Sequence, residues 1–447
     1  MAQHLDDLHK KHGDIFLWRM GTQVMVFLHG YPICKEALGR AEFTNRPDWE
    51  GFKFFEEVPL GVIASNGHIW QSNRRFSLRQ LRDLGMGKSR LVAAVQEQAL
   101  KMVGALKEQA GKPEPVPHSL KVAVVNVIWQ MIASKQFDLK HPKLQEFESI
   151  INEAIQFSTA SAIPDFLPWI NYVLPYFVRR RVFKLDLAVD LKVKFMDYFG
   201  EWIEDHRRTL DRENPRDLID AYLLEMEEEQ GKAEAFRSDR DLFILILDLY
   251  FAGSETVANT LTFMIFYLAA HPDVQRKLQD EIDQVLPEGT LPSMEDKIRL
   301  PYTEAVIHET LRRSSVAALG VQHVAMSDTT LGPYFIPKGT ILNTNINAVH
   351  HDRRYWDDPE KFSPERWLDD QGKFVARKDG FMPFSIGKRV CLGEALARME
   401  LLIMTAAIFQ ALSVTSPPEG QVDSSPDPVN PFGHIPRKEK VVFSLRS

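Results

Sequence analysis

The stretch Phe384-Ser-Ile-Gly-Lys-Arg-Val-Cys-Leu-Gly393 decides the fold, because it places one cysteine between two glycines where a loop becomes a helix. The helix dipole and the free amides of a first helical turn stabilise negative charge, which favours a thiolate at Cys391. Gly387 and Gly393 lack a Cβ and let the backbone lie against a flat ligand, while Arg389 offers a forked cation for a carboxylate. These features predict a haem iron with a sulfur ligand. The competing interpretation is an ordinary buried cysteine.

The bulk composition describes a large globular chain. The 447 residues are 44% hydrophobic and 10% aromatic, which is enough for a sizeable core. The net charge of −7 argues against a nucleic-acid partner. Two cysteines cannot form a disulfide framework, so a reducing, cytosol-facing environment is expected.

Hydrophobic periodicity predicts a mainly α-helical chain with small β-sheets, an α+β fold. A β-hairpin is expected over 15–28 around a Gly-Thr turn, and strands over 319–324 and 340–345 around a turn at 336–339. Helices are expected from residue 31, from residue 70, as an amphipathic series over 91–230, and over 241–271 and 300–313.

The apolar helix expected at 241–271 is long enough to span a membrane, but Glu255 at its middle favours a buried central helix. Within it, Gly253 should weaken the helix, and the hydroxyl of Thr256 can donate back to the carbonyl of Ala252. An acid and an alcohol beside such a distortion can relay protons. Plain helix packing is the alternative.

The residues of three further stretches leave more than one interpretation of their role open. Trp70 and Arg74 share a helix face and can both donate to one carboxylate. An apolar segment over 163–177 precedes Arg179–Arg181, which suits a membrane surface or a helix pair over a pocket. A local basic patch is either a solvated face or a docking surface for an acidic redox partner; it comprises Arg75, Arg79, Arg82, Lys88 and Arg90.

Taken together, these stretches resemble the cytochrome P-450 family, the thiolate-haem monooxygenases, over nearly the whole chain. The cysteine loop matches F-x-x-G-x-R-x-C-x-G, and Glu309-Thr-Leu-Arg312 matches E-x-x-R. The other matching motifs are Pro364-Glu-Arg366-Trp, Ala252-Gly-Ser-Glu-Thr256 and Trp70-x-x-x-Arg74. The runs 74–82, 336–340 and 393–401 are similar to the animal microsomal clan, family two in particular.

The resemblance implies a single catalytic domain over 1–447, with haem b between the long central helix and the cysteine-loop helix, and with the clan's N-terminal membrane anchor absent from this chain. It implies Cys391 as axial ligand, and Glu255 and Thr256 as the residues that deliver protons to dioxygen. The implied propionate ligands are Trp70, Arg74, His323, Arg389 and Arg46, and the implied structural triad is Glu309, Arg312 and Arg366. The residues expected by position to line the substrate pocket are Phe52, Phe54, Phe55, Leu249, Ala252, Ala317, Leu319 and Phe432.

The implied reaction is insertion of one oxygen atom of O2 into a small lipophilic substrate, by hydroxylation or epoxidation. Electrons would come from NADPH through a flavin reductase, with cytochrome b5 as a second candidate partner, on the basic face. The implied location is the cytosolic face of the endoplasmic reticulum, with peripheral membrane contact. Two alternatives are a thiolate-haem isomerase or dehydratase and a haem carrier or sensor without turnover. The pair Glu255–Thr256 speaks against the first, since rearranging a peroxide needs no proton delivery to dioxygen.

Overall fold

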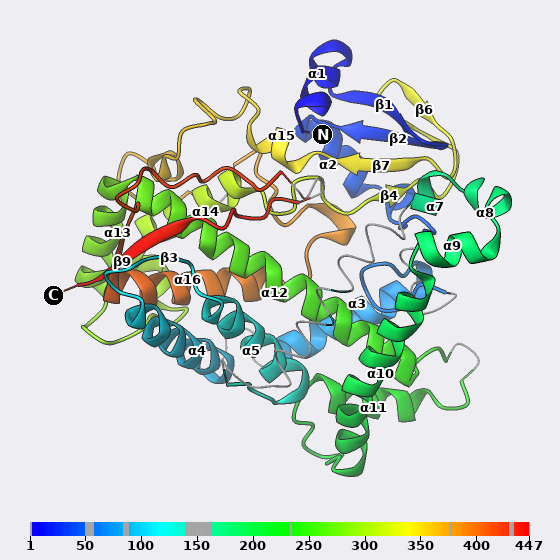
Figure 1. Cartoon of the computed structure of the whole chain (residues 1–447), viewed down its shortest axis with the longest axis horizontal. Helices are drawn as coiled ribbons and strands as arrows, with labels where there is room; N and C mark the ends of the chain where they lie inside the picture. Colours follow the sequence, from blue (N-terminus) through cyan, green and yellow to red (C-terminus); the bar gives the residue numbers. More distant parts are fainter. Residues whose placement is uncertain are drawn as a thin grey trace.

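A computed structural model describes residues 2–49, 58–83, 89–138, 150, 153, 163–232, 235–375, 378–428 and 433–446. The predicted central helix is present as α12 (Asp239–Ala270), which runs through the middle of the molecule (Figure 1). It begins where the side chain of Ser238 accepts a hydrogen bond from the amide of Asp241, an N-cap. Most of its residues are buried, so it is the core around which the other helices pack.

Helices make up most of the fold, and the mixed α+β prediction is confirmed. The α-helices are α1 (Ala2–His12), α2 (Tyr31–Gly39), α3 (Gly67–Asp83), α4 (Ser89–Glu108), α5 (Ser119–Ala133), α7 (Ile163–Phe166), α8 (Ile170–Val173), α9 (Tyr176–Val182), α10 (Leu185–Arg208), α11 (Leu218–Glu229), α12, α13 (Pro272–Val285), α14 (Pro301–Ser314), α15 (Ile346–His350) and α16 (Glu394–Ala411). Short 3-10 turns include η1 (Ala41–Phe43), η3 (Asp296–Arg299), η4 (Pro364–Trp367) and η5 (Gly387–Arg389).

The strands in the described part of the chain form three small sheets. One has the order β1-β2-β7-β4, with β1–β2 antiparallel as the predicted hairpin and β2–β7 parallel; the others are β3-β9-β8 and β5-β6. The two strands expected around 336–339 are shorter than predicted, and the hairpin β5–β6 between them was not predicted. The strands are β1 (Ile15–Met20), β2 (Gln23–Leu28), β3 (Pro113–Pro115), β4 (His323–Val324), β5 (Thr329–Leu331), β6 (Tyr334–Ile336), β7 (Ile341–Thr344), β8 (Leu412–Thr415) and β9 (Lys440–Leu445).

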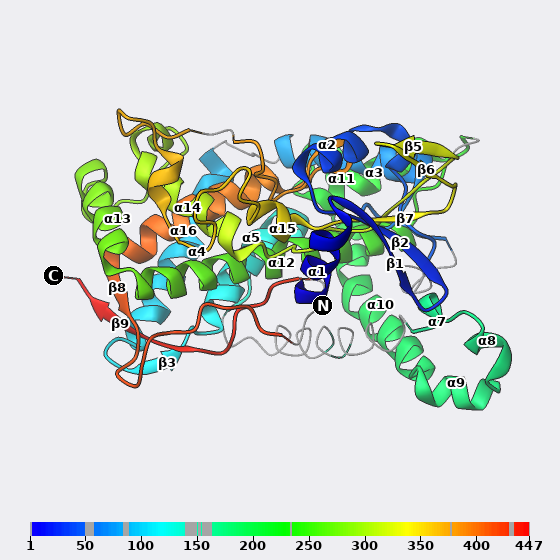
Figure 2. The same ribbon diagram turned by 90° about the horizontal axis from the view of Figure 1, so that it is seen from above.

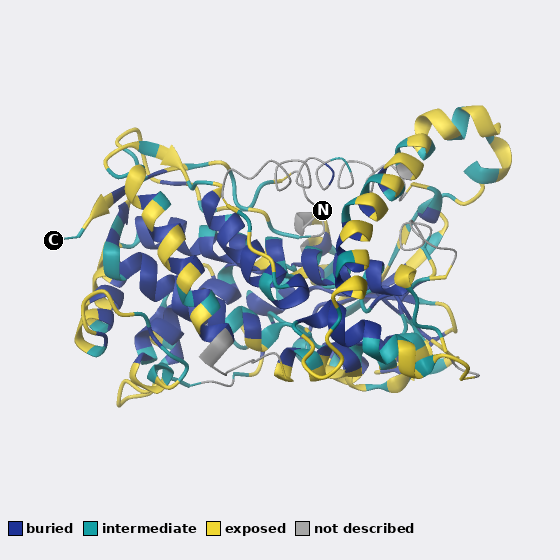
Figure 3. Ribbon diagram, turned by 90° about the horizontal axis from the view of Figure 1, so that it is seen from below, coloured by how far each residue is buried: buried dark blue, intermediate teal, exposed yellow. Residues whose placement is uncertain are grey.

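An arm made of α8 and α9 projects from the body at the end of α10 (Figure 2). Its side chains are among the most exposed of the molecule, with Tyr172 90% and Phe177 72% exposed (Figure 3). None of the helices in the described part of the chain combines the length and the apolar character that crossing a membrane requires.

Candidate active site

Cys391 lies directly before α16, in the loop that η5 begins. Its amide donates to the carbonyl of Phe384 at 2.9 Å, which closes the loop on itself. Burial raises the pKa of the Cys391 thiol, while hydrogen bonds from the amides of Gly393 and Glu394 oppose that shift. A Cβ at Gly387, where φ is +80°, would lie 2.0 Å from the carbonyl oxygen of Leu38, so glycine alone fits there. The loop therefore presents a cysteine that is exposed as a residue, while its sulfur lies among protein atoms and is supported by two amides.

Three arginines that the sequence assigns to haem propionates converge beside this loop. Arg46 and Arg389 are buried, and none of the three pairs with a carboxylate among the described residues. Burial, and then Arg46 and Arg74, lower the pKa of Arg389 to about 8; burial and Arg74 lower the pKa of Arg46 to about 9. Their acceptors are neutral oxygens. Arg389 donates to the carbonyls of Thr44, Val62 and Ser65 and to Oδ1 of Asn66 at 3.2 Å, Arg46 to the carbonyls of Ile63, Val321 and Gln322, and Arg74 to the carbonyl of Val390.

The three arginines Arg46, Arg74 and Arg389, here called the arginine cradle, fit a haem whose two propionates are negatively charged. Three guanidinium groups that repel one another would be stabilised by two carboxylates, because neighbouring opposite charge favours the charged form. Trp70 also supports a propionate site. Its indole Nε1 is buried without a partner in the described structure, and the guanidinium of Arg389 lies 4.0 Å from the centre of its ring. A propionate bound here would accept a hydrogen bond from the unpaired Nε1 of Trp70 and would neutralise the nearby arginines.

His323 lies at the start of β4, in the same surroundings. Its Nδ1 is 2.7 Å from the carbonyl oxygen of Phe43, which fixes Nδ1 as the protonated nitrogen. Burial, and then the nearby Arg46, lower the pKa of His323 to about 3. Donation from Nε2 to a propionate therefore requires protonation of the ring, which the charge of the propionate itself would favour.

The segment 61–66, which supplies several of the carbonyl acceptors, is held from its other side by α12. The carboxylate of Asp248 accepts hydrogen bonds from the amides of Val62 and Ile63 at 2.6 and 2.9 Å, and Asp241 accepts from the amide of Gly61 at 3.0 Å. Burial raises the pKa of Asp248 to about 7, against the effect of these amides. The sequence does not reveal this role of Asp248, because an acid in an apolar helix gives no indication of a loop 185 residues away that it contacts.

The middle of α12 presents Ala252 and Thr256, four residues apart, as exposed residues on a helix that is mostly buried. The Thr256 hydroxyl donates to the carbonyl of Ala252 at 2.8 Å, as the sequence suggests. The helix runs through Gly253 without a break, so the expected weakening there stays a prediction. A Cβ at this position would lie 2.6 Å from Cδ1 of Ile128, so the glycine allows α5 to approach closely. Glu255 turns towards α5 and forms an ion pair with Lys121.

Behind the cysteine loop, Glu309 and Arg312 on α14 form a fully buried pair at 2.8 Å, and the Arg366 Nε donates to Glu309 at 3.1 Å. Sequence reasoning missed a fourth member, since Trp367 Nε1 also donates to Glu309 at 3.0 Å. Arg312 donates in addition to the carbonyl of His350 at 2.7 Å. The network joins α14 to the loop that leads to Cys391.

The predicted pocket residues are not gathered into one described cavity. Leu249 is buried in the main core, whereas Ala317 is half-buried. Leu319 packs with sheet residues such as Phe27 and Ile341. Phe52, Phe54, Phe55 and Phe432 lie outside the described residues.

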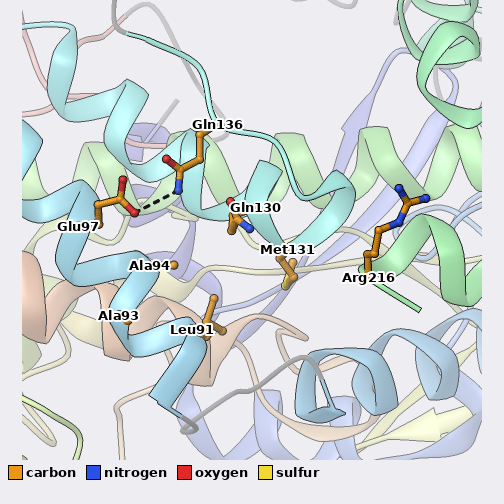
Figure 4. Close-up of a pocket in the computed structure, with 8 residues that line it drawn as sticks. All are labelled: Leu91, Ala93, Ala94, Glu97, Gln130, Met131, Gln136 and Arg216. Atoms are coloured by element: carbon orange, nitrogen blue, oxygen red, sulfur yellow. Dashed lines mark hydrogen bonds between the residues drawn. The ribbon is translucent and has the colours of Figure 1, made fainter. Parts of the chain in front are cut away.

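Two cavities stand out in the described structure. One of about 520 Å³ includes Arg46 and Asn66 in its lining. The other, of about 240 Å³, lies between α4 and α5 and has none of the predicted site residues in its lining (Figure 4). In that cavity Gln136 donates to Glu97 at 3.4 Å, so part of its polar lining is already paired.

The predicted basic patch is partly neutralised within the molecule. Arg79 pairs with Glu225, and Arg82 pairs with Asp83 at 3.3 Å. Arg75 is exposed and has no acidic partner among the described residues. Nothing is described of the side chains of Lys88 and Arg90.

Comparison with known proteins agrees with this geometry. The family model described as "Cytochrome P450" matches residues 1–443. The chain is similar to "Cytochrome P450 2L1" of Panulirus argus, with 41% identity over all of this chain and 91% of that protein. It is 36% identical to "Cytochrome P450 2J2" of Homo sapiens over 91% of this chain and 80% of the relative. "Farnesoate epoxidase" of Bombyx mori is 33% identical over 98% and 87% of the two chains.

Members of this family use haem b, take electrons from NADPH through a redox partner, and act on a substrate together with O2. The match covers the full length that carries the cysteine loop, the arginine cradle and the central helix. The chain therefore belongs to the cytochrome P450 family and is a haem-thiolate monooxygenase.

Proposed function

We propose that oxygen is inserted into a small lipophilic substrate between α12 and the loop of Cys391, with Cys391 as the axial ligand. The observation that carries this proposal is the cysteine sulfur at the start of α16 with the amides of Gly393 and Glu394 donating to it. A haem held there supplies the iron at which dioxygen is reduced and the substrate is oxidised. Every other contribution comes from the residues of this chain.

Those residues bind, orient and supply protons. Arg46, Arg74 and Arg389 would hold the propionates, with Trp70 Nε1 and protonated His323 as further donors. The amides at the start of α16 would support the sulfur as the thiolate that binds the iron. Glu255 and Thr256 would bring protons from solvent to the distal side.

Replacement of Thr256 by alanine tests the proton supply. The variant should retain haem, because the hydroxyl donates only to the carbonyl of Ala252. Without the hydroxyl, protons reach dioxygen more slowly, and a larger share of the NADPH electrons should appear as hydrogen peroxide. Peroxide released per NADPH consumed measures this in the enzyme reconstituted with a flavin reductase.

Thr262→Ala is the matched control, since Thr262 makes the same type of bond to the carbonyl of Ala258 at 2.9 Å. It should leave the peroxide share unchanged. An unchanged share in the Thr256 variant as well would remove Thr256 from the proton path.

We further propose that the reductase, and cytochrome b5 as a second partner, bind at α3. Arg75 supports this, because it is the arginine of the patch that is exposed and free of an acid in the described structure. Arg75→Glu should raise the KM for reductase several-fold, most strongly at low salt, since screening weakens exposed charge pairs. Arg212→Glu, on an exposed residue paired with Glu227, is the control. Equal effects of both changes would argue against a specific site at α3.

The exposed arm of α8 and α9 supports peripheral contact with the endoplasmic reticulum membrane on its cytosolic face. Exposed aromatic residues at and within the arm, Trp169, Tyr172, Tyr176 and Phe177, precede Arg179–Arg181 of α9 in the chain. Apolar side chains next to cations suit an anionic lipid surface. Tyr172→Ser with Phe177→Ser should reduce sedimentation with phosphatidylcholine–phosphatidylserine vesicles.

The control for that experiment is Ile298→Ser with Leu445→Ser, which removes exposed apolar side chains from η3 and β9. If both double variants lose vesicle binding equally, the contact is not specific to the arm.

We also infer that residues 1–447 form one catalytic domain, because one hydrophobic core includes side chains from α3 to β9.

A further inference from the structure

The ion pair between Lys121 and Glu255 joins α5 to the middle of α12. Lys121 is the only charged residue of α5, a helix in which all other residues except Gln130 are buried. Its ammonium has no acidic partner other than Glu255 in the described structure. A single cation on an apolar helix, matched to a single acid at the middle of the central helix, is not an ordinary solvated surface pair.

The packing of the two helices brings the pair together. Gly253 lies two residues before Glu255 and lets Ile128 of α5 approach closely. Lys121 is seven residues before Ile128 and so lies on the same face of α5. The side chains of Lys121 and Glu255 are 23% and 35% exposed, which leaves both in contact with solvent while screening is reduced.

The pair also sets the direction of the carboxylate. Neighbouring residues of a helix point about 100° apart, so Glu255 and Thr256 face different sides of α12. Thr256 shares its exposed face with Ala252, whereas Glu255 points to α5. As long as the ion pair is closed, the acid does not face the side on which Thr256 lies.

We propose that Lys121 is a positioning residue that holds the carboxylate of Glu255 turned away from Thr256 between proton deliveries. This inference rests on the proposed role of Glu255 in proton supply. When the pair opens, the carboxylate takes one proton from bulk water and passes it to the Thr256 oxygen. The original hydroxyl proton of Thr256 then moves on to the side of α12 on which dioxygen would bind. The Glu255–Thr256 pair thus gains one proton and gives up one proton, and no electron is transferred.

The test uses the haem-loaded full chain with NADPH and a flavin reductase, in which peroxide per NADPH and the solvent deuterium isotope effect on NADPH oxidation are measured. Lys121→Gln and the apolar Lys121→Met release the acid, so the peroxide share should fall by about two- to fivefold, the range expected for a partly exposed pair, and the solvent isotope effect should fall towards one. Lys121→Arg keeps the pair and should match the wild type. Two independent uncharged variants guard against the loss of folding in one of them.

Three further variants make the result decisive. Glu255→Gln should raise the peroxide share, and Lys121→Gln combined with Glu255→Gln should match Glu255→Gln alone. Lys101→Gln, which breaks the exposed pair with Glu97 at 2.7 Å on α4, should have no effect. If Glu255→Gln raises the peroxide share but the uncharged Lys121 variants equal the wild type or raise it too, the positioning role is wrong. If Glu255→Gln itself has no effect, the proposed proton path fails first.

Discussion

Replacement of Cys391 by serine is expected to abolish the reaction while leaving the polypeptide folded. A serine hydroxyl would remain protonated, whereas the sulfur of Cys391, supported by the amides of Gly393 and Glu394, would bind an iron ion as a thiolate. A haem bound without the Cys391 thiolate would lose the sulfur ligand on which the oxygenation chemistry depends, so product formation should fall to the background of the assay. Product formed with NADPH and reductase, together with the circular dichroism spectrum, measures both parts of this prediction.

The chain offers a matched control in its only other cysteine. Cys34 is fully buried in α2, and burial raises the pKa of its thiol far above the usual range. Its Sγ contacts the carbonyl of Leu28 at 3.6 Å. Cys34→Ser should leave turnover intact, because this thiol fills space and binds nothing. Retention of turnover in Cys391→Ser would contradict the assignment of the axial ligand.

The second large effect is expected at Arg312. Its guanidinium is fully buried, pairs with Glu309 and holds the carbonyl of His350. Arg312→Ala leaves a buried carboxylate with only Arg366 and Trp367 as side-chain partners, and removing one partner of a buried pair costs about 3–5 kcal/mol. The free energy of unfolding, measured by urea denaturation, should fall by that amount, and the cells should yield little haem-loaded protein.

Arg208→Ala is the control for Arg312, because Arg208 forms an exposed pair with Asp205 at 2.8 Å at the same three-residue spacing. Exposed pairs contribute little to stability, so the unfolding midpoint should hardly move. Similar losses in both variants would mean that the buried network has no special role in the fold.

The parts of the site that the sequence predicts correctly depend on local spacing. The first turn of α16 lies directly after Cys391, so its amides reach the sulfur whatever the rest of the fold does. The back-bond of Thr256 to Ala252 spans one helical turn, and Glu309 with Arg312 spans three residues. In motifs this short, the spacing along the helix already sets the distances between the interacting groups.

The parts that the sequence misses are contacts between segments far apart in the chain. Lys121 and Glu255, like Asp248 and Ile63, meet only because two helices and a loop pack together. The reason for Gly253 is likewise tertiary, since it is the side chain of Ile128 that leaves no room for a Cβ. No periodicity in a single sequence carries this information.

The hairpin β5–β6 shows the same limit for the fold. Its strands have three residues each around a Gly-Pro turn, and two exposed aromatic side chains, Tyr334 and Phe335, obscure the alternation that marks a strand. The strand β4 consists of two residues and is defined by pairing with β7, so its bounds could not come from its own sequence.

The absorption spectrum of the reduced, haem-loaded protein under carbon monoxide tests the central claim most directly, because the position of the main band reports the ligand opposite the gas. With Cys391 as a thiolate ligand, the band should be strongly red-shifted, and Cys34→Ser should give the same spectrum. A band at the position of imidazole-ligated haem in well-folded wild-type protein would contradict the account, whatever the enzyme's turnover.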